Sequence, residues 1–196
     1  MMSMHNYIPE MNDYYSELKN VIDNLDRDEI NKSMNAIYDA YQADKTIYVF
    51  GNGGSAATAS HMMNDFNKGI STELKKKFRF QCLNDNVATL MAVANDIGYE
   101  DVFVNQLENR LNGSELILAI SGSGNSRNVM KAVEYAKSCG CKIIGLTGYK
   151  GGRLDILADY HMHVNVDDMQ LTEDVHMTFD HMMMRLFCNQ LGASGH

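Results

Sequence analysis

The 196-residue sequence has no long apolar run and no recognisable export signal. A membrane-spanning helix needs about 20 consecutive apolar residues, and no segment approaches that length. The first residues, MMSMHNYIPEMND, lack the basic and apolar regions of a secretion signal. These absences exclude an ordinary membrane-spanning protein and predict a cytoplasmic protein with no membrane partner.

Cysteine is scarce, and no C-x-x-C pair occurs. Without such pairs the thiols lack the usual spacing of a zinc or redox motif. We expect buried thiols in a reducing compartment. The four positions are Cys82, Cys139, Cys141 and Cys188.

Basic residues are also few, and the formal net charge is −8. The one basic cluster lies at residues 75–79, where we expect a solvated loop edge, so no nucleic-acid partner is predicted. An acidic protein can still bind a phosphorylated metabolite through backbone amides and helix N-termini. The sequence has no G-x-S-x-G motif, which would indicate a serine hydrolase, and no complete Walker loop, which would indicate a P-loop nucleotide-binding protein.

The pattern along the chain predicts a single domain over residues 1–196. Apolar residues at spacings of three and four indicate N-terminal helices at about 10–44. Strands then alternate with helices over about 45–166, which predicts a three-layer α/β sandwich with a five-stranded parallel sheet. A C-terminal helix is expected at about 172–191, with Thr172 as its N-cap.

Two glycine-serine turns follow predicted strands. GNGGSA, residues 51–56, fits the G-x-G-x-x-A pattern of a dinucleotide site, but the acid expected about 20 residues on is found only at Asp85. A tight turn without a ligand is the simpler alternative. The second turn, SGSGNS at 121–126, favours a phosphate or phosphosugar site, because ligands bind beyond the carboxyl ends of parallel strands.

The ordered set GNGGSA, ANDIGYEDVF, ISGSGNSRNV, GLTGYKGG and a C-terminal helix with histidine resembles the sugar isomerase (SIS) domains, and among them the phosphoheptose isomerases. The resemblance covers roughly residues 10–188 and implies the flavodoxin-like SIS fold. It also implies a homotetramer with active sites at subunit interfaces.

The resemblance implies a set of substrate contacts. The sugar would be bound by Asn52, Gly53, Gly54, Ser55, Asn95, Asp96 and Glu173. The phosphate would be bound by Ser121, Gly122, Ser123 and Ser126. Family members usually read S-T-S where this chain has Ser121, Gly122 and Ser123, so one hydroxyl contact is lost while the backbone amide remains.

A zinc site is implied in the same way, with ligands His61, Asp65, Glu173 and His181. His61 and Asp65 are four residues apart and share one helix face. The family's glutamate is Asp65 here, and its glutamine is Glu173. In one straight helix, residues 173 and 181 would be about 12 Å apart along the axis, so Glu173 must lie at the helix start to reach the ion.

The resemblance implies an aldose–ketose isomerase that interconverts sedoheptulose 7-phosphate and D-glycero-D-manno-heptose 7-phosphate through an enediol, with a role in heptose biosynthesis. Asp65 would be the base and His181 the acid partner. The alternative from another class is a non-catalytic SIS protein that binds a phosphosugar or a protein partner in a regulatory role. Without the resemblance, ordinary polar or core roles for His61, Asp65 and His181 would be favoured, and Glu173 with His176 forms only half of a di-metal motif.

Overall fold

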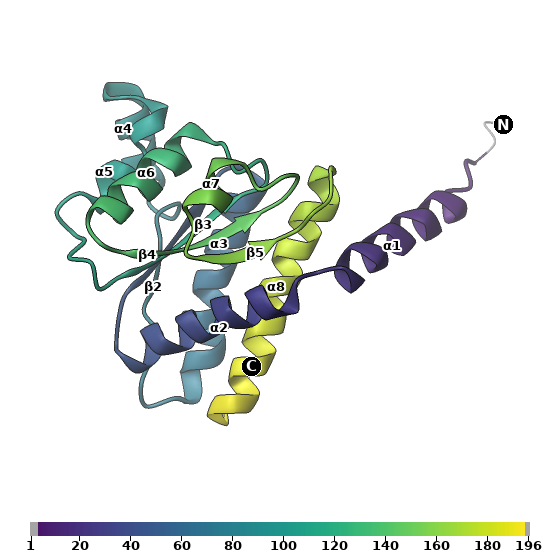
Figure 1. Ribbon diagram of the computed structural model, residues 1–196, viewed down its shortest axis with the longest axis horizontal. Coiled ribbons are helices and arrows are strands. Elements are labelled where there is room, and N and C mark those ends of the chain that lie inside the picture. Colours follow the sequence, from purple (N-terminus) through teal and green to yellow (C-terminus); the bar gives the residue numbers. More distant parts are fainter. Residues whose placement is uncertain (1–3, 195–196) are drawn as a thin grey trace.

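A computed structural model describes residues 4–194, so the outermost residues of the predicted 1–196 domain lie outside the described part. Its centre is a parallel sheet in strand order β2-β1-β3-β4-β5 (Figure 1). The strands are β1 (Ile47–Gly51), β2 (Phe80–Cys82), β3 (Leu116–Ser121), β4 (Lys142–Thr147) and β5 (Tyr160–His163). Gly51 pairs with Ile120, and Ser121 pairs with Thr147. The carboxyl ends of the central strands therefore meet at one edge of the sheet.

Helices cover both faces of the sheet, which confirms the predicted three layers (Figure 1). One face carries α2 (Arg27–Gln42), α3 (Gly54–Asn64) and α8 (Met169–Leu191). The other carries α4 (Val87–Asp96), α5 (Val104–Leu107), α6 (Arg127–Ser138) and α7 (Gly152–Leu157). Short helical segments η1 (Asp65–Ile70), η2 (Ser71–Glu73) and η3 (Tyr99–Asp101) complete the fold.

The alternation of side chains along the strands creates two hydrophobic cores. Val49 and Leu118 face the core beneath α2, α3 and α8, whereas Tyr48 and Ile117 face the core beneath α6. All four are buried. Burying an aliphatic side chain of this size contributes roughly 1.5–3 kcal/mol, so both sheet faces stabilise the domain.

Helix α8 begins earlier than the sequence pattern predicts. The Asp168 carboxylate caps it by accepting a hydrogen bond of 2.8 Å from the Leu171 amide. The predicted cap at Thr172 is therefore wrong: its hydroxyl donates instead to the Asp168 carbonyl at 2.7 Å. Because the helix starts at Met169, Glu173 lies about one turn inside it.

Helix α1 (Ile8–Asp23) extends away from the rest of the chain (Figure 1). None of its residues is buried, although Ile8, Met11 and Tyr15 are large apolar side chains. The Tyr14 hydroxyl donates a hydrogen bond of 2.7 Å to Asp174 of α8. The free side of α1 is therefore an apolar surface with little cover from its own chain.

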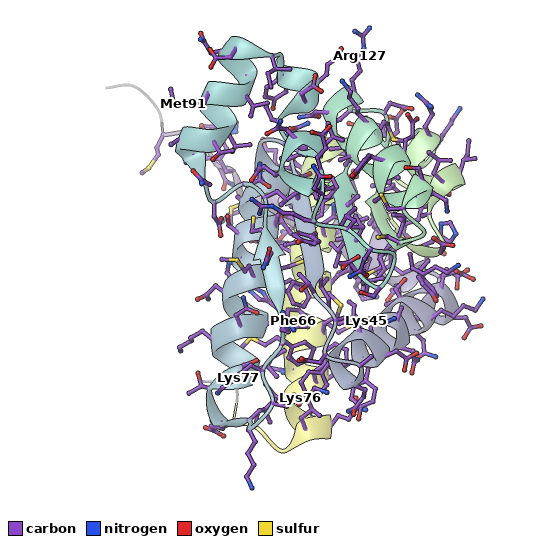
Figure 2. The ribbon with its side chains drawn as sticks, turned by 90° about the vertical axis from the view of Figure 1, so that its left-hand side faces the viewer. Lys45, Phe66, Lys76, Lys77, Met91 and Arg127 are labelled. Atoms are coloured by element: carbon purple, nitrogen blue, oxygen red, sulfur yellow. The ribbon has the colours of Figure 1, made fainter. Side chains whose placement is uncertain are left out.

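The basic cluster at residues 75–79 occupies one end of the molecule, where Figure 2 shows Lys76 and Lys77 far from Arg127. Lys76 donates to the carbonyl of Gln42 at 2.6 Å, and Lys77 donates to that of Thr72 at 3.0 Å. These ammonium groups therefore bind carbonyl oxygens of the last residue of α2 and of the short helix η2. Among residues 4–194 no helix has the length and apolarity needed to cross a membrane.

Candidate functional site

The first glycine-serine turn connects β1 to α3. Gly53 has a φ of 56°, a conformation that a residue with a side chain rarely adopts. Asn52 and Asn128 exchange two amide hydrogen bonds of 2.8 Å, and the Tyr99 hydroxyl donates to Asn52 at 2.8 Å. The turn is therefore tied to η3 and to α6, the helix that follows the second turn. Buried Ser55 lies in the first turn of α3.

The second turn connects β3 to α6. The hydroxyls of Ser121 and Ser126 lie 3.2 Å apart, and Ser123 is exposed at the tip of the turn. Gly124 has a φ of 65°, and its amide donates to the Ser121 carbonyl at 2.9 Å. Ser126 is the N-cap residue of α6, but its side chain makes no capping hydrogen bond. A helix N-terminus of this kind attracts anions, so the turn is chemically suited to a phosphate.

Gly122, where the hydroxyl residue of the family pattern is absent, is buried against α8. A Cβ atom at this position would lie 3.1 Å from the Met169 sulfur and 3.7 Å from the Thr172 methyl group. The space beside the backbone is therefore occupied by α8 side chains. The Gly122 carbonyl also accepts a hydrogen bond of 2.8 Å from the Gly148 amide, which holds the two strand ends together.

His61 and Asp65 lie on successive turns at the carboxyl end of α3. The helix continues from Asp65 as the π-helical segment η1, and π-helical turns occur frequently at functional sites. The His61 Nε2 atom is 3.5 Å from Asp65 Oδ2. His61 is exposed and Asp65 is buried, so the pair lies at the protein surface with its carboxylate inside.

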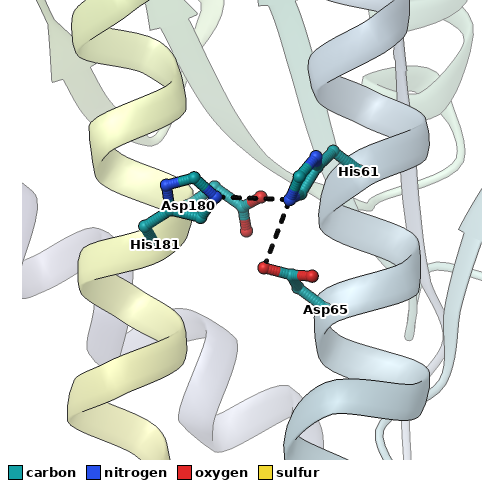
Figure 3. Close-up of side chains that lie close together, drawn as sticks. All are labelled: His61, Asp65, Asp180 and His181. Carbon is teal, nitrogen blue, oxygen red and sulfur yellow. Dashed lines mark hydrogen bonds and ion pairs between the residues drawn. The ribbon is translucent and has the colours of Figure 1, made fainter. Parts of the chain in front are cut away.

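Helix α8 adds a second histidine and a second carboxylate to this pair (Figure 3). The His181 Nε2 atom is 3.2 Å from His61 Nε2. One ligand atom from each of four side chains lies within 4.8 Å of the others, and the four are His61, Asp65, Asp180 and His181. Three of them were predicted as ligands from the sequence, and the structure brings those three together.

Asp180 is the functional candidate that sequence reasoning missed. Its side chain is fully buried, and neither carboxylate oxygen has a hydrogen-bond partner among residues 4–194. Burial, and secondly the charge of Asp65, raise the pKa of Asp180 to about 7. The available signal was its position one helical turn from His176 and Met183, both on the buried face of α8.

The donor set suits zinc. Tetrahedral zinc with bonds of about 2.0–2.1 Å places neighbouring ligand atoms about 3.3–3.4 Å apart. The separations of 3.2 Å between the two imidazoles and 3.5 Å between His61 and Asp65 are close to that value. Imidazole nitrogen and carboxylate oxygen are both common zinc ligands. The residues present therefore fit the ion that the resemblance implies.

Glu173 lies apart from this cluster. A Cβ atom built on Gly54 would be 2.2 Å from Glu173 Oε2, so the carboxylate rests against the first residue of α3. The cluster therefore contains three of the four predicted ligands together with Asp180. The fourth predicted ligand, Glu173, lies at the turn between β1 and α3. A negative charge beside a helix N-terminus is favourable, which explains this position.

The remaining predicted contacts lie on α4 and α8. Asn95 and Asp96 are exposed at the end of α4, where the Asn95 amide donates to Asp96 at 2.7 Å. His176, the possible partner of Glu173 in a di-metal motif, is buried and makes a hydrogen bond of 3.1 Å through Nε2 with the Thr147 carbonyl. That bond directs its ring toward β4, so the E-x-x-H pair does not form a metal site.

The thiols follow the sequence expectation in part, because Cys141 and Cys188 are buried whereas Cys82 and Cys139 are only half-buried. All four cysteines are free, and burial raises the pKa of Cys82 and of Cys141 to about 11. Both side chains are therefore protonated at neutral pH, and neither is a reactive thiolate.

Comparison with known proteins identifies the family. The family model described as SIS domain matches residues 12–148. The phosphoheptose isomerase of Aliarcobacter butzleri is 37% identical over 145 residues, which are 74% of this chain and 76% of that protein. The chain belongs to the phosphoheptose isomerase family of SIS domain proteins. A probable phosphoheptose isomerase of Thermoplasma volcanium is 31% identical over 92% of the chain and 91% of its own length.

Solved SIS domain structures confirm the fold. A phosphoheptose isomerase from Francisella tularensis aligns with a TM-score of 0.84 at 25% identity, over 93% of this chain and 98% of that one. The enzyme from Neisseria gonorrhoeae also gives a TM-score of 0.84, at 23% identity, over 94% of this chain and all of the other. The resemblance inferred from the ordered motifs and the predicted fold class are both confirmed.

Proposed function

We propose that this SIS domain protein is an aldose–ketose isomerase that converts sedoheptulose 7-phosphate to D-glycero-D-manno-heptose 7-phosphate through an enediol. The observation that carries the proposal is the convergence of His61, Asp65 and His181, whose side chains meet within 3.5 Å across two helices. The reaction needs groups that move protons between carbon and oxygen, and this cluster provides them.

Asp65 has the role of the base. Its carboxylate takes a proton from the carbon beside the carbonyl to give the enediol, and returns a proton to the neighbouring carbon. His181 exchanges protons with the two oxygens, so that the carbonyl moves along the sugar without net loss of a proton. Burial of Asp65 places the carboxylate away from bulk water, where its charge interacts more strongly with a bound sugar.

Zinc would be held by His61, Asp65 and His181, whose ligand atoms converge. The resemblance implies Glu173 as a fourth ligand, but its carboxylate lies against Gly54. When bound, zinc would polarise the carbonyl and hydroxyl oxygens. The sugar would be bound by Asn52, Gly53, Gly54, Ser55, Asn95, Asp96 and Glu173. Its phosphate would be bound by the turn of Ser121, Gly122, Ser123 and Ser126, whose hydroxyls and helix N-terminus support this assignment.

The assembly that we propose is a homotetramer with active sites at subunit interfaces. The uncovered apolar side of α1 supports it, because large apolar groups gain stability when a second copy covers them. The exposure of His61 and His181 is also consistent with a site completed by another subunit. We place the enzyme in the cytoplasm and in heptose biosynthesis, with a sugar phosphate as its only partner besides its own copies.

The regulatory alternative, a non-catalytic SIS protein, has less support. A protein that only binds a phosphosugar needs the phosphate turn but does not need two imidazoles and a carboxylate that converge on one point. The purified protein is to be incubated with sedoheptulose 7-phosphate, with and without zinc, while aldose formation is followed by NMR. Turnover is expected, and binding without turnover in either state would support the regulatory role instead.

A further inference from the structure

The carboxylate of Asp180 lies in an energetically unfavourable environment. Asp180 is fully buried on α8, and neither of its oxygens accepts a hydrogen bond from any residue in the range 4–194. Buried carboxylates are ordinarily paired with a cation or with hydrogen-bond donors, because removing the charge from water is costly. A side chain of this kind indicates a partner that the polypeptide itself does not provide.

The Asp180 carboxylate points toward three other potential ligands. Figure 3 shows it between the two helices, directed at the space bounded by His61, Asp65 and His181. Its ligand oxygen lies within 4.8 Å of the ligand atoms of all three. Together the four side chains bring two carboxylates and two imidazoles to one point, and these are the oxygen and nitrogen donors of a metal site. The partner that suits this group is therefore a divalent cation.

Glu173 cannot take the same position without leaving its present contact. Its carboxylate lies against Gly54 at the beginning of α3, whereas His61 is two turns further along that helix. Gly54 and His61 are seven positions apart, which corresponds to about 10 Å of helix. The side chain of Glu173 is therefore located at the first glycine-serine turn, between β1 and α3.

We propose that Asp180, in place of Glu173, is the fourth ligand of the metal ion, together with His61, Asp65 and His181. The inference rests on the proposed metal site and specifies which residues form it. Two carboxylates and two imidazoles would balance the charge of a divalent ion, and such an ion would be the electrostatic partner that the Asp180 carboxylate lacks. Glu173 is then left to contact the sugar.

The test compares two variants that each remove one negative charge with little change in shape, Asp180→Asn and Glu173→Gln. Zinc affinity is measured by competition with a chromophoric chelator, and folding is monitored by circular dichroism. Asp180→Asn is expected to weaken zinc binding by at least about 100-fold, because loss of an outer-shell partner alone costs roughly 10–100-fold. Glu173→Gln and the control Asp174→Asn, an exposed position on α8, are expected to bind zinc like the wild type.

The melting temperature gives a second readout that does not depend on catalysis. In metal-free protein, Asp180→Asn should melt at a higher temperature than the wild type, because the substitution removes a buried carboxylate that has no hydrogen-bond partner among residues 4–194. With saturating zinc the order should reverse, and the wild type should melt higher. A purely structural role for Asp180 would not produce this change of sign.

Zinc affinity retained in Asp180→Asn would overturn the proposal, and so would a comparable loss in Glu173→Gln. If Asp180→Asn fails to fold, the Glu173→Gln arm still decides whether Glu173 is a ligand. Wild-type protein that binds no zinc but isomerises sedoheptulose 7-phosphate would remove the metal site and leave the proposed activity intact. Zinc binding without turnover would leave the metal site intact and remove the proposed activity.

Discussion

The Nε2 atoms of His61 and His181 lie 3.2 Å apart, although 120 positions separate the two residues in the chain. At this distance one ring can donate a hydrogen bond to the other, so the two nitrogens point toward each other. The same two nitrogens are the atoms that would bind a metal ion. The contact between α3 and α8 therefore creates a site that neither helix contains alone.

Removal of one imidazole tests the metal site directly. We expect His61→Ala to lower zinc affinity by at least about 100-fold, since the loss of a direct ligand exceeds the roughly 10–100-fold cost of losing an outer-shell partner. Zinc retained after dialysis is measured by elemental analysis. His5→Ala removes an exposed histidine outside the site and should keep the wild-type zinc content. Equal zinc in both variants would exclude His61 from the ligand set.

Asp65→Asn tests the proposed base. The amide cannot accept the proton from carbon, so kcat should fall by roughly 10²–10⁴, the usual contribution of a general base. The measurement is aldose formation by NMR at saturating sedoheptulose 7-phosphate and zinc. Asp174→Asn, which alters an exposed carboxylate on α8, serves as the control. A wild-type kcat in Asp65→Asn would assign proton transfer to another group.

Gly54→Ala tests the contact that holds Glu173 at the turn. The new Cβ would lie 2.2–2.5 Å from the carboxylate atoms of Glu173 and would displace that side chain. We expect at most a small loss in the free energy of unfolding, because the atoms that the new Cβ meets are the far end of a flexible side chain that can rotate away. Combining Gly54→Ala with Glu173→Ala should recover most of it. Additive losses in urea denaturation would show that the two positions do not interact.

Stability at acid pH should depend on His176. Burial lowers the pKa of His176 to about 4, below the ordinary value of 6.5. Between these values the unfolded chain binds a proton that the native state does not, so stability is present above pH 6.5 and is lost as the pH falls toward 4. The full effect is roughly 3 kcal/mol. His176→Gln, compared with wild type by urea denaturation of metal-free protein at pH 7 and pH 5, should show a smaller decrease.

The uncovered side of α1 predicts an oligomer that depends on it. Replacing Ile8 and Tyr15 together by aspartate should dissociate the assembly, because charges would be placed in an apolar contact. The fold should survive, since no residue of α1 is buried in its own chain. Sedimentation gives the mass and circular dichroism the fold, with Asn12→Asp as the control on the same helix. An unchanged mass would locate the subunit contacts elsewhere.

The fold was predictable because its signals are local and repeated. The strands β1, β3 and β4 are short, largely apolar runs, each followed by a glycine-containing turn and a helix, and the sheet order places β1, β3 and β4 next to one another. His61, Asp65 and His181 were predicted through the ordered motifs of the family. Domain limits and individual substrate contacts remain predictions.

Asp180 was missed for a physical reason. It is one acidic residue in a methionine-rich helix, and its importance depends on tertiary burial against α3, which the spacing along α8 does not specify. On the same helix Leu186 is exposed whereas Asp180 and His176 are buried, so burial along α8 does not follow side-chain polarity. The start of α8 also differs from the prediction, because Asp168 caps the helix in place of the predicted Thr172.

Two glycines set the distance between the helices that carry the four clustered side chains. Gly54 receives the carboxylate of Glu173, and Gly69 receives the methyl group of Met184, where a Cβ would lie 2.6 Å from that carbon. The clustered side chains lie between these two close approaches, so their spacing is set by backbone packing before any ion arrives. A set of ligands fixed in this way selects metal ions by their radius. It should accept zinc with little rearrangement and exclude calcium, which needs longer bonds and more oxygen ligands.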